Sequence, residues 1–169
     1  AIRFRAPTGT KLAITEAIGI KVLDLVGKEV GRHNVAITIG LVGVHAANYP
    51  VNLIHQWNGG PEEGWLAIQL KSGTGIKTEE LTERLRGVFA RELPEVKFSF
   101  EPSDMINRVM SLGSFTPIEV AVAGPSLAVS KAHADKLYAR LKTIPALRDV
   151  QIAQALDFPT VDVNVDRER

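Results

Sequence analysis

A chain of 169 residues, 45% hydrophobic and 23% charged, is long enough for one ordinary domain or two small ones with a buried core. Its 20 basic and 19 acidic residues leave a net charge of +1 without a basic run, which excludes a typical nucleic-acid-binding protein. The absence of cysteine excludes disulfides, thiolate metal sites and cysteine nucleophiles. The most apolar stretch, residues 35–54, contains His45 and Pro50 and would be a costly membrane span.

A strand, a helix and a second strand are predicted at the start of the chain. Alternating hydrophobicity predicts the first strand, with three residues on its buried face: Ile2, Phe4 and Ala6. A turn that ends at Thr10 offers a cap for a helix over residues 11–30, and Gly31 ends this helix. Its apolar residues recur at helical spacing: Ile14, Ala17, Ile18, Leu25 and Val26. A strand is then predicted over residues 35–44.

The middle of the chain predicts a long loop over residues 48–64, a strand over 65–70, a helix and a further strand. Thr78 is the expected cap of the helix, and Pro94 closes it. The helix has an apolar stripe: Leu81, Leu85, Val88 and Phe89. The last of these strands, residues 95–101, alternates and is predicted to be half buried, with Val96, Phe98 and Phe100 on one side and Lys97 and Ser99 on the other.

The pattern restarts after residue 117. Alternation at Ile118, Val120 and Val122 predicts a strand. A helix that Ser126 caps should then run to Thr143, with Leu137, Leu141 and Ile144 on its apolar side. Strands are predicted over residues 148–155 and 160–165.

These elements predict an α+β protein with two subdomains. The first, residues 1–114, has the order βαββαβ, a ferredoxin-like layout with helices on one face of an antiparallel or mixed sheet. The second, residues 115–169, has the order βαββ and lacks the last helix and strand of that layout. A chain that opens in strand-like sequence and stops within a subdomain is expected to be a piece of a larger protein.

The sequence predicts neither catalysis nor a bound metal or cofactor. The four histidines lack the short spacings of metal ligands. Asp162, Asn164 and Asp166 superficially resemble the start of a calcium loop, but valines alternate with them, which indicates the wet face of a strand. Nucleophile-elbow, P-loop and Rossmann patterns are absent from the sequence, so we predict that the protein is not an enzyme.

Two sets of residues are candidate substrate contacts. The first is a soft apolar set in and after the strand over 95–101: Phe98, Phe100, Met105, Met110 and Phe115. Such side chains suit a promiscuous pocket, although packing in a core is the favoured explanation from the sequence alone. The second is the glycine-rich stretch from Tyr49 to Trp65, which includes Trp57 and has the alternative interpretation of a plain hairpin connection. The predicted substrate-binding residues are Phe98, Phe100, Met105, Met110, Tyr49 and Trp57.

Four segments in a fixed order then carry a resemblance to a known family. They are RAPTGT at residues 5–10, EVKFSF at 95–100, SFTPIEVAVAG at 114–124 and VDVNVDRER at 161–169. In this order they resemble the second large periplasmic loop of a resistance-nodulation-division (RND) efflux transporter of the acriflavine-resistance type. In that family the second porter subdomain is interrupted by a docking insertion, which would explain why it is incomplete here.

The resemblance implies a function. It implies the periplasmic porter portion of a proton-driven transporter in the inner membrane of a bacterium, which exports amphiphilic or hydrophobic compounds. The implied assembly is a homotrimer with a periplasmic adaptor and an outer-membrane channel, without nucleic acid. Phe98 and Phe100 lie where drug pumps of the family have pocket aromatics, and residues 44–57 correspond roughly to a loop between two pockets.

Three alternatives remain open at this point. One is a free-standing ferredoxin-like ligand-binding or regulatory module, and another is a small enzyme of acyl or phosphoryl transfer. The third is a porter of a heavy-metal pump for copper or silver, because that branch of the family uses methionines near this place. Met110 is offset from the methionine pattern of that branch, and one or two sulfurs make a weak site, so organic substrates are preferred.

Overall fold

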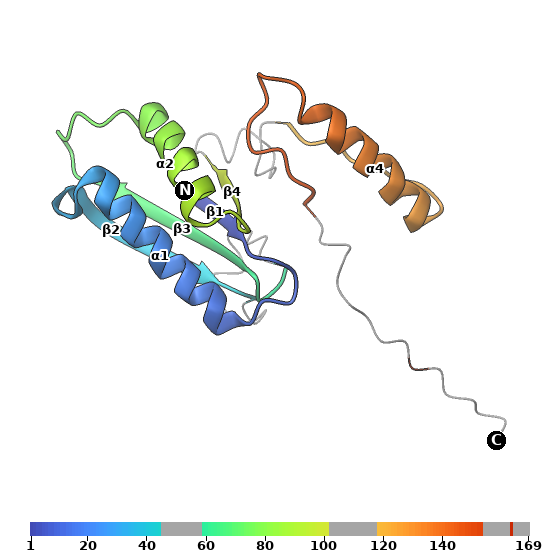
Figure 1. Ribbon diagram of the computed structural model, residues 1–169, viewed down its shortest axis with the longest axis horizontal. Helices are drawn as coiled ribbons and strands as arrows, with labels where there is room; N and C mark the ends of the chain where they lie inside the picture. The colour runs from blue at the N-terminus through green and yellow to red at the C-terminus, as the bar shows by residue number, and fades with distance from the viewer. Residues whose placement is uncertain (45–58, 102–117, 154–162, 164–169) are drawn as a thin grey trace.

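The computed structural model describes residues 1–44, 59–101, 118–153 and Val163 of the chain. These residues form an α+β structure of three helices and one four-stranded sheet, without a closed barrel (Figure 1). In chain order the elements are β1 (Ile2–Arg5), α1 (Leu12–Val30), the 3-10 turn η1 (Arg32–Asn34), β2 (Val35–Val42), β3 (Glu63–Leu70), α2 (Thr78–Glu92), β4 (Lys97–Phe100) and α4 (Leu127–Leu141).

All neighbouring strands in the sheet are antiparallel, and their order is β2-β3-β1-β4. The short strand β1 is therefore central, with Phe4 opposite Gly64 of β3 on one side and Phe98 of β4 on the other. Helices α1 and α2 lie side by side on one face of this sheet (Figure 1). The predicted order of the first six strands and helices and the one-sided packing of the helices are confirmed.

The core lies between that face of the sheet and the two helices. It consists of Ile2, Phe4, Val22, Leu25, Val26, Val30, Leu66, Leu81, Leu85 and Phe89. The predicted apolar face of the first strand and the stripe of α2 are confirmed, with Val88 partly buried. A cluster of this composition supplies most of the driving force for folding, because burial of each large apolar side chain contributes about 1.5–3 kcal/mol.

The predicted stripe of α1 is wrong in its first half. Ile14 and Ala17 are exposed, and the buried residues there are Thr15 and Gly19. The reason is the close approach of the helix to the sheet: a Cβ atom on Gly19 would lie 3.3 Å from the ring of Phe4. Small residues allow this approach, and a search for hydrophobic periodicity passes over them.

Phe4 also requires a glycine on the neighbouring strand. A Cβ atom on Gly64 would lie 2.2 Å from Cζ of Phe4, which is far inside van der Waals contact. The ring therefore lies over the bare backbone of β3, and the core has no room for a side chain at this position.

The ends of the helices differ in part from the predictions. Gly31 ends α1 with a φ of 81°, as expected. Thr10 and Thr78 are not the caps, because the cap positions belong to Lys11 and Lys77. The hydroxyl of Thr10 instead donates to the carbonyl of Pro7 at 2.6 Å, within the preceding turn.

The second subdomain forms its helix but not the predicted strands in the described residues. Ser126 is the cap residue of α4, without a side-chain hydrogen bond, and within this helix no residue is buried. Residues 118–124 and 148–153 form no strand. A strand needs a neighbour for its backbone hydrogen bonds, and the alternation of Ile118, Val120 and Val122 supplies none by itself. The strand predicted over residues 160–165 lies outside the described residues except for Val163.

Candidate binding site around strand β4

Strand β4 ends the sheet on the side of α2 and carries two of the predicted contact residues. Its register places Phe98 and Phe100 on the helix-covered face, where both rings are half buried. The ring of Phe89 on α2 lies 4.5 Å from that of Phe98 and 6.1 Å from that of Phe100, almost parallel to the latter. Such aromatic pairs contribute beyond the area they bury. The two phenylalanines thus extend the core and keep part of each ring accessible.

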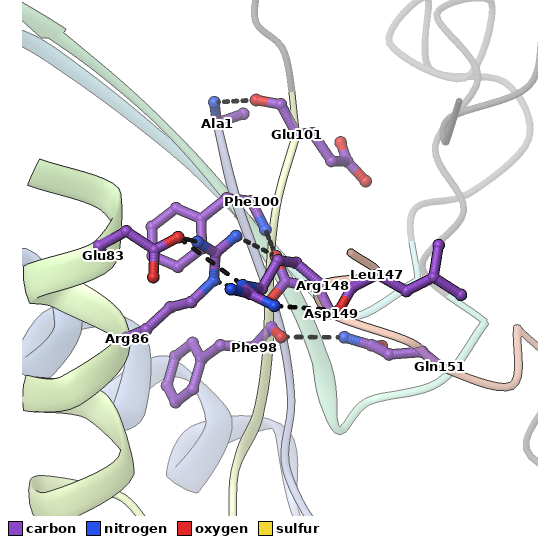
Figure 2. A network of polar contacts seen from close by, with 10 residues as sticks. All are labelled: Ala1, Glu83, Arg86, Phe98, Phe100, Glu101, Leu147, Arg148, Asp149 and Gln151. Carbon is purple, nitrogen blue, oxygen red and sulfur yellow. Dashed lines mark hydrogen bonds and ion pairs between the residues drawn. The ribbon is translucent and has the colours of Figure 1, made fainter. Parts of the chain in front are cut away.

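Side chains from residues 149–151 complete the outer edge of β4 (Figure 2). The backbone N–H of Phe100 donates to Oδ2 of Asp149 at 3.1 Å, and Nε2 of Gln151 donates to the carbonyl of Phe98 at 3.1 Å. These contacts satisfy groups that an edge strand otherwise offers to another strand. Residues 148–153, predicted as a strand, therefore dock on β4 through side chains rather than through a backbone ladder.

Arg86 of α2 holds the same segment by a two-pronged ion pair. Its Nε and Nη2 donate to the two carboxylate oxygens of Asp149 at 3.0 and 2.7 Å, and its guanidinium lies 5.0 Å from the ring centroid of Phe100. The hydrogen bond with Asp149 raises the pKa of Arg86 above its usual value, so this cation stays charged at any ordinary pH. Bidentate pairs of this type fix orientation as well as adding energy. We call Arg86, Asp149 and Gln151 the β4 clamp.

Asp149 holds a backbone conformation that few residues adopt. Its φ is 55°, and it is the one non-glycine residue with positive φ in the part of the chain that the structure describes. Asparagine and aspartate tolerate this region better than other side chains do. Residue type and backbone together direct both carboxylate oxygens at α2 and β4.

The clamp can be tested through the exchange of a single amide. Replacement of Asp149 by glycine keeps the positive φ but removes the acceptor, so we expect hydrogen exchange at the Phe100 amide to become about tenfold faster, the equivalent of about 1.4 kcal/mol. Asp149→Asn retains an oxygen acceptor and should give a smaller acceleration. If NMR showed equal hydrogen-exchange rates at the Phe100 amide in the wild-type chain and the Asp149→Gly variant, the clamp would have no structural role.

The face of the sheet opposite the helices carries buried charges on β1. Nε of Arg5 forms an ion pair with Oε1 of Glu63, and its two terminal nitrogens donate to the carbonyls of Ile152 and Ala153 at 2.9 and 2.8 Å. Arg3 pairs with Glu101 at 3.5 Å. Burial lowers the pKa of Arg3 from its usual value, and the charge of Glu101 partly offsets this effect. The sequence predicted one buried face for this strand, and the structure buries both.

An open cavity of about 610 Å³ lies where the turn before α1 meets the connection from α2 to β4. It is lined by Pro7, Gly9, Thr10, Lys11, Ile14, Ile18, Glu92, Leu93, Pro94, Glu95 and Val96. Its size falls in the range of small-molecule sites. None of the predicted contact residues lines it.

The other predicted contact residues, Tyr49, Trp57, Met105 and Met110, lie outside the described residues. Among the described residues, no group of three or more histidine or acidic side chains could hold a metal ion. The helices described here are too short or too polar to cross a membrane.

The sequence analysis did not identify the β4 clamp of Arg86, Asp149 and Gln151. Arg86 and Asp149 are 63 positions apart in the chain, and no local pattern links them.

Comparisons with known proteins find no family model, curated protein or solved structure that matches this chain.

Proposed function

We propose that the chain forms part of the periplasmic porter region of a bacterial RND efflux transporter that exports amphiphilic or hydrophobic compounds. In this proposal residues 1–114 are one complete ferredoxin-like subdomain and residues 115–169 are about half of the next. The protein then acts by binding and release of its substrate, and the proton flow that drives transport runs through other parts of the transporter.

The observation that carries the proposal is the arrangement of the first subdomain. A βαββαβ order with the sheet order β2-β3-β1-β4 and both helices on one face supports the ferredoxin-like layout that the resemblance implies. This arrangement supports the proposal without being specific to it, since one layout of this kind serves many functions. The specific support is the order of the four sequence motifs along the chain.

The state of α4 gives a second line of support. Leu127 and Val129 on this helix and Ile118 before it are among the exposed large hydrophobic residues. A helix that buries none of its residues obtains little stability from packing, which is the main source of helical stability in proteins. A half subdomain whose remaining helix and strand belong elsewhere in a transporter would have this property.

The half-buried rings on β4 are the proposed substrate contacts. The ring of Phe100 lies almost parallel to that of Phe89, and the guanidinium of Arg86 lies 5.0 Å from its centroid, so the core and a cation fix its position. A rigid aromatic ring with part of its area accessible offers apolar contact at little cost in conformational entropy. Such a contact discriminates weakly between substrates, as a multidrug transporter requires.

Alanine substitutions in the intact transporter test this function. In a host without other pumps, Phe98→Ala and Phe100→Ala should lower resistance to some amphiphilic compounds and not to others. The expected change in apparent affinity is about tenfold per lost ring contact, for about 1.4 kcal/mol. Resistance to copper and silver should not change, and a loss confined to these ions would favour the heavy-metal alternative.

A control on α2 separates binding from folding. Val88→Ala removes a partly buried side chain of α2, and it should leave every resistance unchanged as long as the protein accumulates normally. The sequence on either side of this chain in its gene offers an independent test. The transporter proposal fails if no stretch of ~20 apolar residues is encoded there, or if both phenylalanine variants fold and transport every compound normally.

A further inference from the structure

The open cavity of about 610 Å³ lies at the end of the subdomain where α1 begins and α2 ends. Ile18, Leu93 and Val96 line it and are partly buried against the core, so they form its floor. The rings of Phe98 and Phe100 do not line it. The cavity is therefore separate from the proposed substrate contacts on β4.

Hydrogen bonds within the chain hold the walls of the cavity in place. The hydroxyl of Thr10 donates to the carbonyl of Pro7 at 2.6 Å and closes the turn before α1. Nζ of Lys21 on α1 donates to the carbonyl of Glu92 at 3.1 Å and thereby links α1 to the end of α2. A site whose walls are already fixed loses less conformational entropy when a ligand binds.

The mouth of the cavity carries charges of both signs. Lys11 lies on one wall at the cap position of α1, and Glu95 lies on the other wall in the connection from α2 to β4. Within the described ranges neither side chain forms an ion pair or a hydrogen bond, and the first turn of α1 contains no acidic residue. Glu92, by contrast, pairs with Arg91 at 3.3 Å. A bound molecule thus meets one uncompensated cation and one uncompensated anion on different walls.

We propose that this cavity binds a single zwitterionic amphiphile, a molecule with an alkyl chain and a head group of the phosphocholine or sulfobetaine type. The anionic part of the head lies at Lys11 and its ammonium group lies at Glu95, while the alkyl chain packs on Pro7, Ile14 and the floor. Complementary charges on both walls select the head group, and the apolar lining supplies contact area. A head with a single charge leaves one wall unmatched and is repelled by it.

Two detergents with the same alkyl chain test the charge pattern by NMR titration of the full chain, below the concentration at which micelles form. Dodecylphosphocholine and dodecyltrimethylammonium share their cation and differ by a phosphate. The wild-type chain should bind dodecylphosphocholine about fivefold more tightly, the effect of one exposed ion pair. Chemical-shift changes at the amides of Gly9, Ile14 and Val96 should place the bound molecule in the cavity.

Charge variants test the two walls separately. Lys11→Glu should reverse the preference between the detergents, whereas Lys71→Glu makes the same change on an exposed lysine outside the cavity and should keep it. Glu95→Gln should weaken both detergents by about fivefold, because both carry the ammonium group. Glu79→Gln removes an acidic residue from the first turn of α2 and should leave both affinities unchanged.

A pair of isoleucines on α1 tests the apolar wall. Ile14 lines the cavity and Ile20 does not, although they are 54% and 63% exposed. Ile14→Ser should weaken both detergents by about fivefold through lost apolar contact, and Ile20→Ser should leave them unchanged. Since both side chains are largely exposed, neither variant is expected to unfold.

Three results would overturn the inference. One is equal or weaker binding of dodecylphosphocholine relative to dodecyltrimethylammonium in the wild-type chain, and another is a preference that Lys11→Glu leaves unchanged. The third is binding to phosphatidylcholine vesicles without binding of the monomeric detergent, because the ligand would then be a membrane surface. The transporter proposal does not depend on these results, since its contacts on β4 are tested by the phenylalanine variants.

Discussion

Replacement of Phe89 by alanine should destabilise the protein more than any other single truncation on α2, by about 3–5 kcal/mol. Phe89 is 1% exposed, and its ring contacts those of both Phe98 and Phe100. Its removal leaves a cavity between α2 and β4 that neither strand nor helix can close, because β1 fixes the position of β4 from the other side. Whole domains are stable by only about 5–15 kcal/mol, so this variant should be close to unfolding at ordinary temperature.

Urea unfolding followed by circular dichroism measures the effect, and exposed positions supply the control. Leu12→Ala removes a large apolar side chain that is exposed on α1, and its effect should stay within about 0.5 kcal/mol. Phe100→Ala should fall between the two, because its ring is half buried. If Phe89→Ala lowered the free energy of unfolding by less than about 1 kcal/mol, β4 and α2 would not be packed as described.

Local patterns in the sequence predicted those parts of the fold that depend on local periodicity. Alternation predicted a buried face for β1 with Ile2 and Phe4, and helical spacing predicted a buried stripe for α2 with Leu81, Leu85 and Phe89. All five residues lie in the core. The same method failed on α1, where the contact with the sheet is made by Thr15 and Gly19. Hydrophobicity scales give these two residues little weight, although the space that Gly19 leaves admits the ring of Phe4.

Features that join distant parts of the chain could not be predicted in this way. The segment at residues 118–124 has a clear strand pattern but forms no strand, because such a pattern states which residues could face a core and not whether a partner strand is present. Likewise, Arg5 and Arg86 occur in sequence contexts typical of exposed residues, and only the tertiary fold brings Glu63 and Asp149 to them.

Loss of the ion pair between Arg5 and Glu63 should also lower the free energy of unfolding by a large amount. Both side chains are under 10% exposed, at 9% and 3%. Glu63→Gln preserves the shape and removes the negative charge next to a buried guanidinium, so we expect a loss of about 3 kcal/mol in the free energy of unfolding. The effect should extend to residues 152–153, since the same guanidinium donates to their carbonyls. Faster hydrogen exchange of that segment would report it.

A surface pair provides the comparison for this prediction. Glu83 is exposed and pairs with Arg86, so Glu83→Gln should cost less than about 1 kcal/mol. Replacement of both Arg5 and Glu63 by methionine should be less harmful than the sum of the single changes, because the double variant leaves no buried charge of this pair uncompensated. Additive effects in that double-mutant cycle would mean that the two groups do not interact, and the close contact on this face of β1 would then contribute nothing to stability.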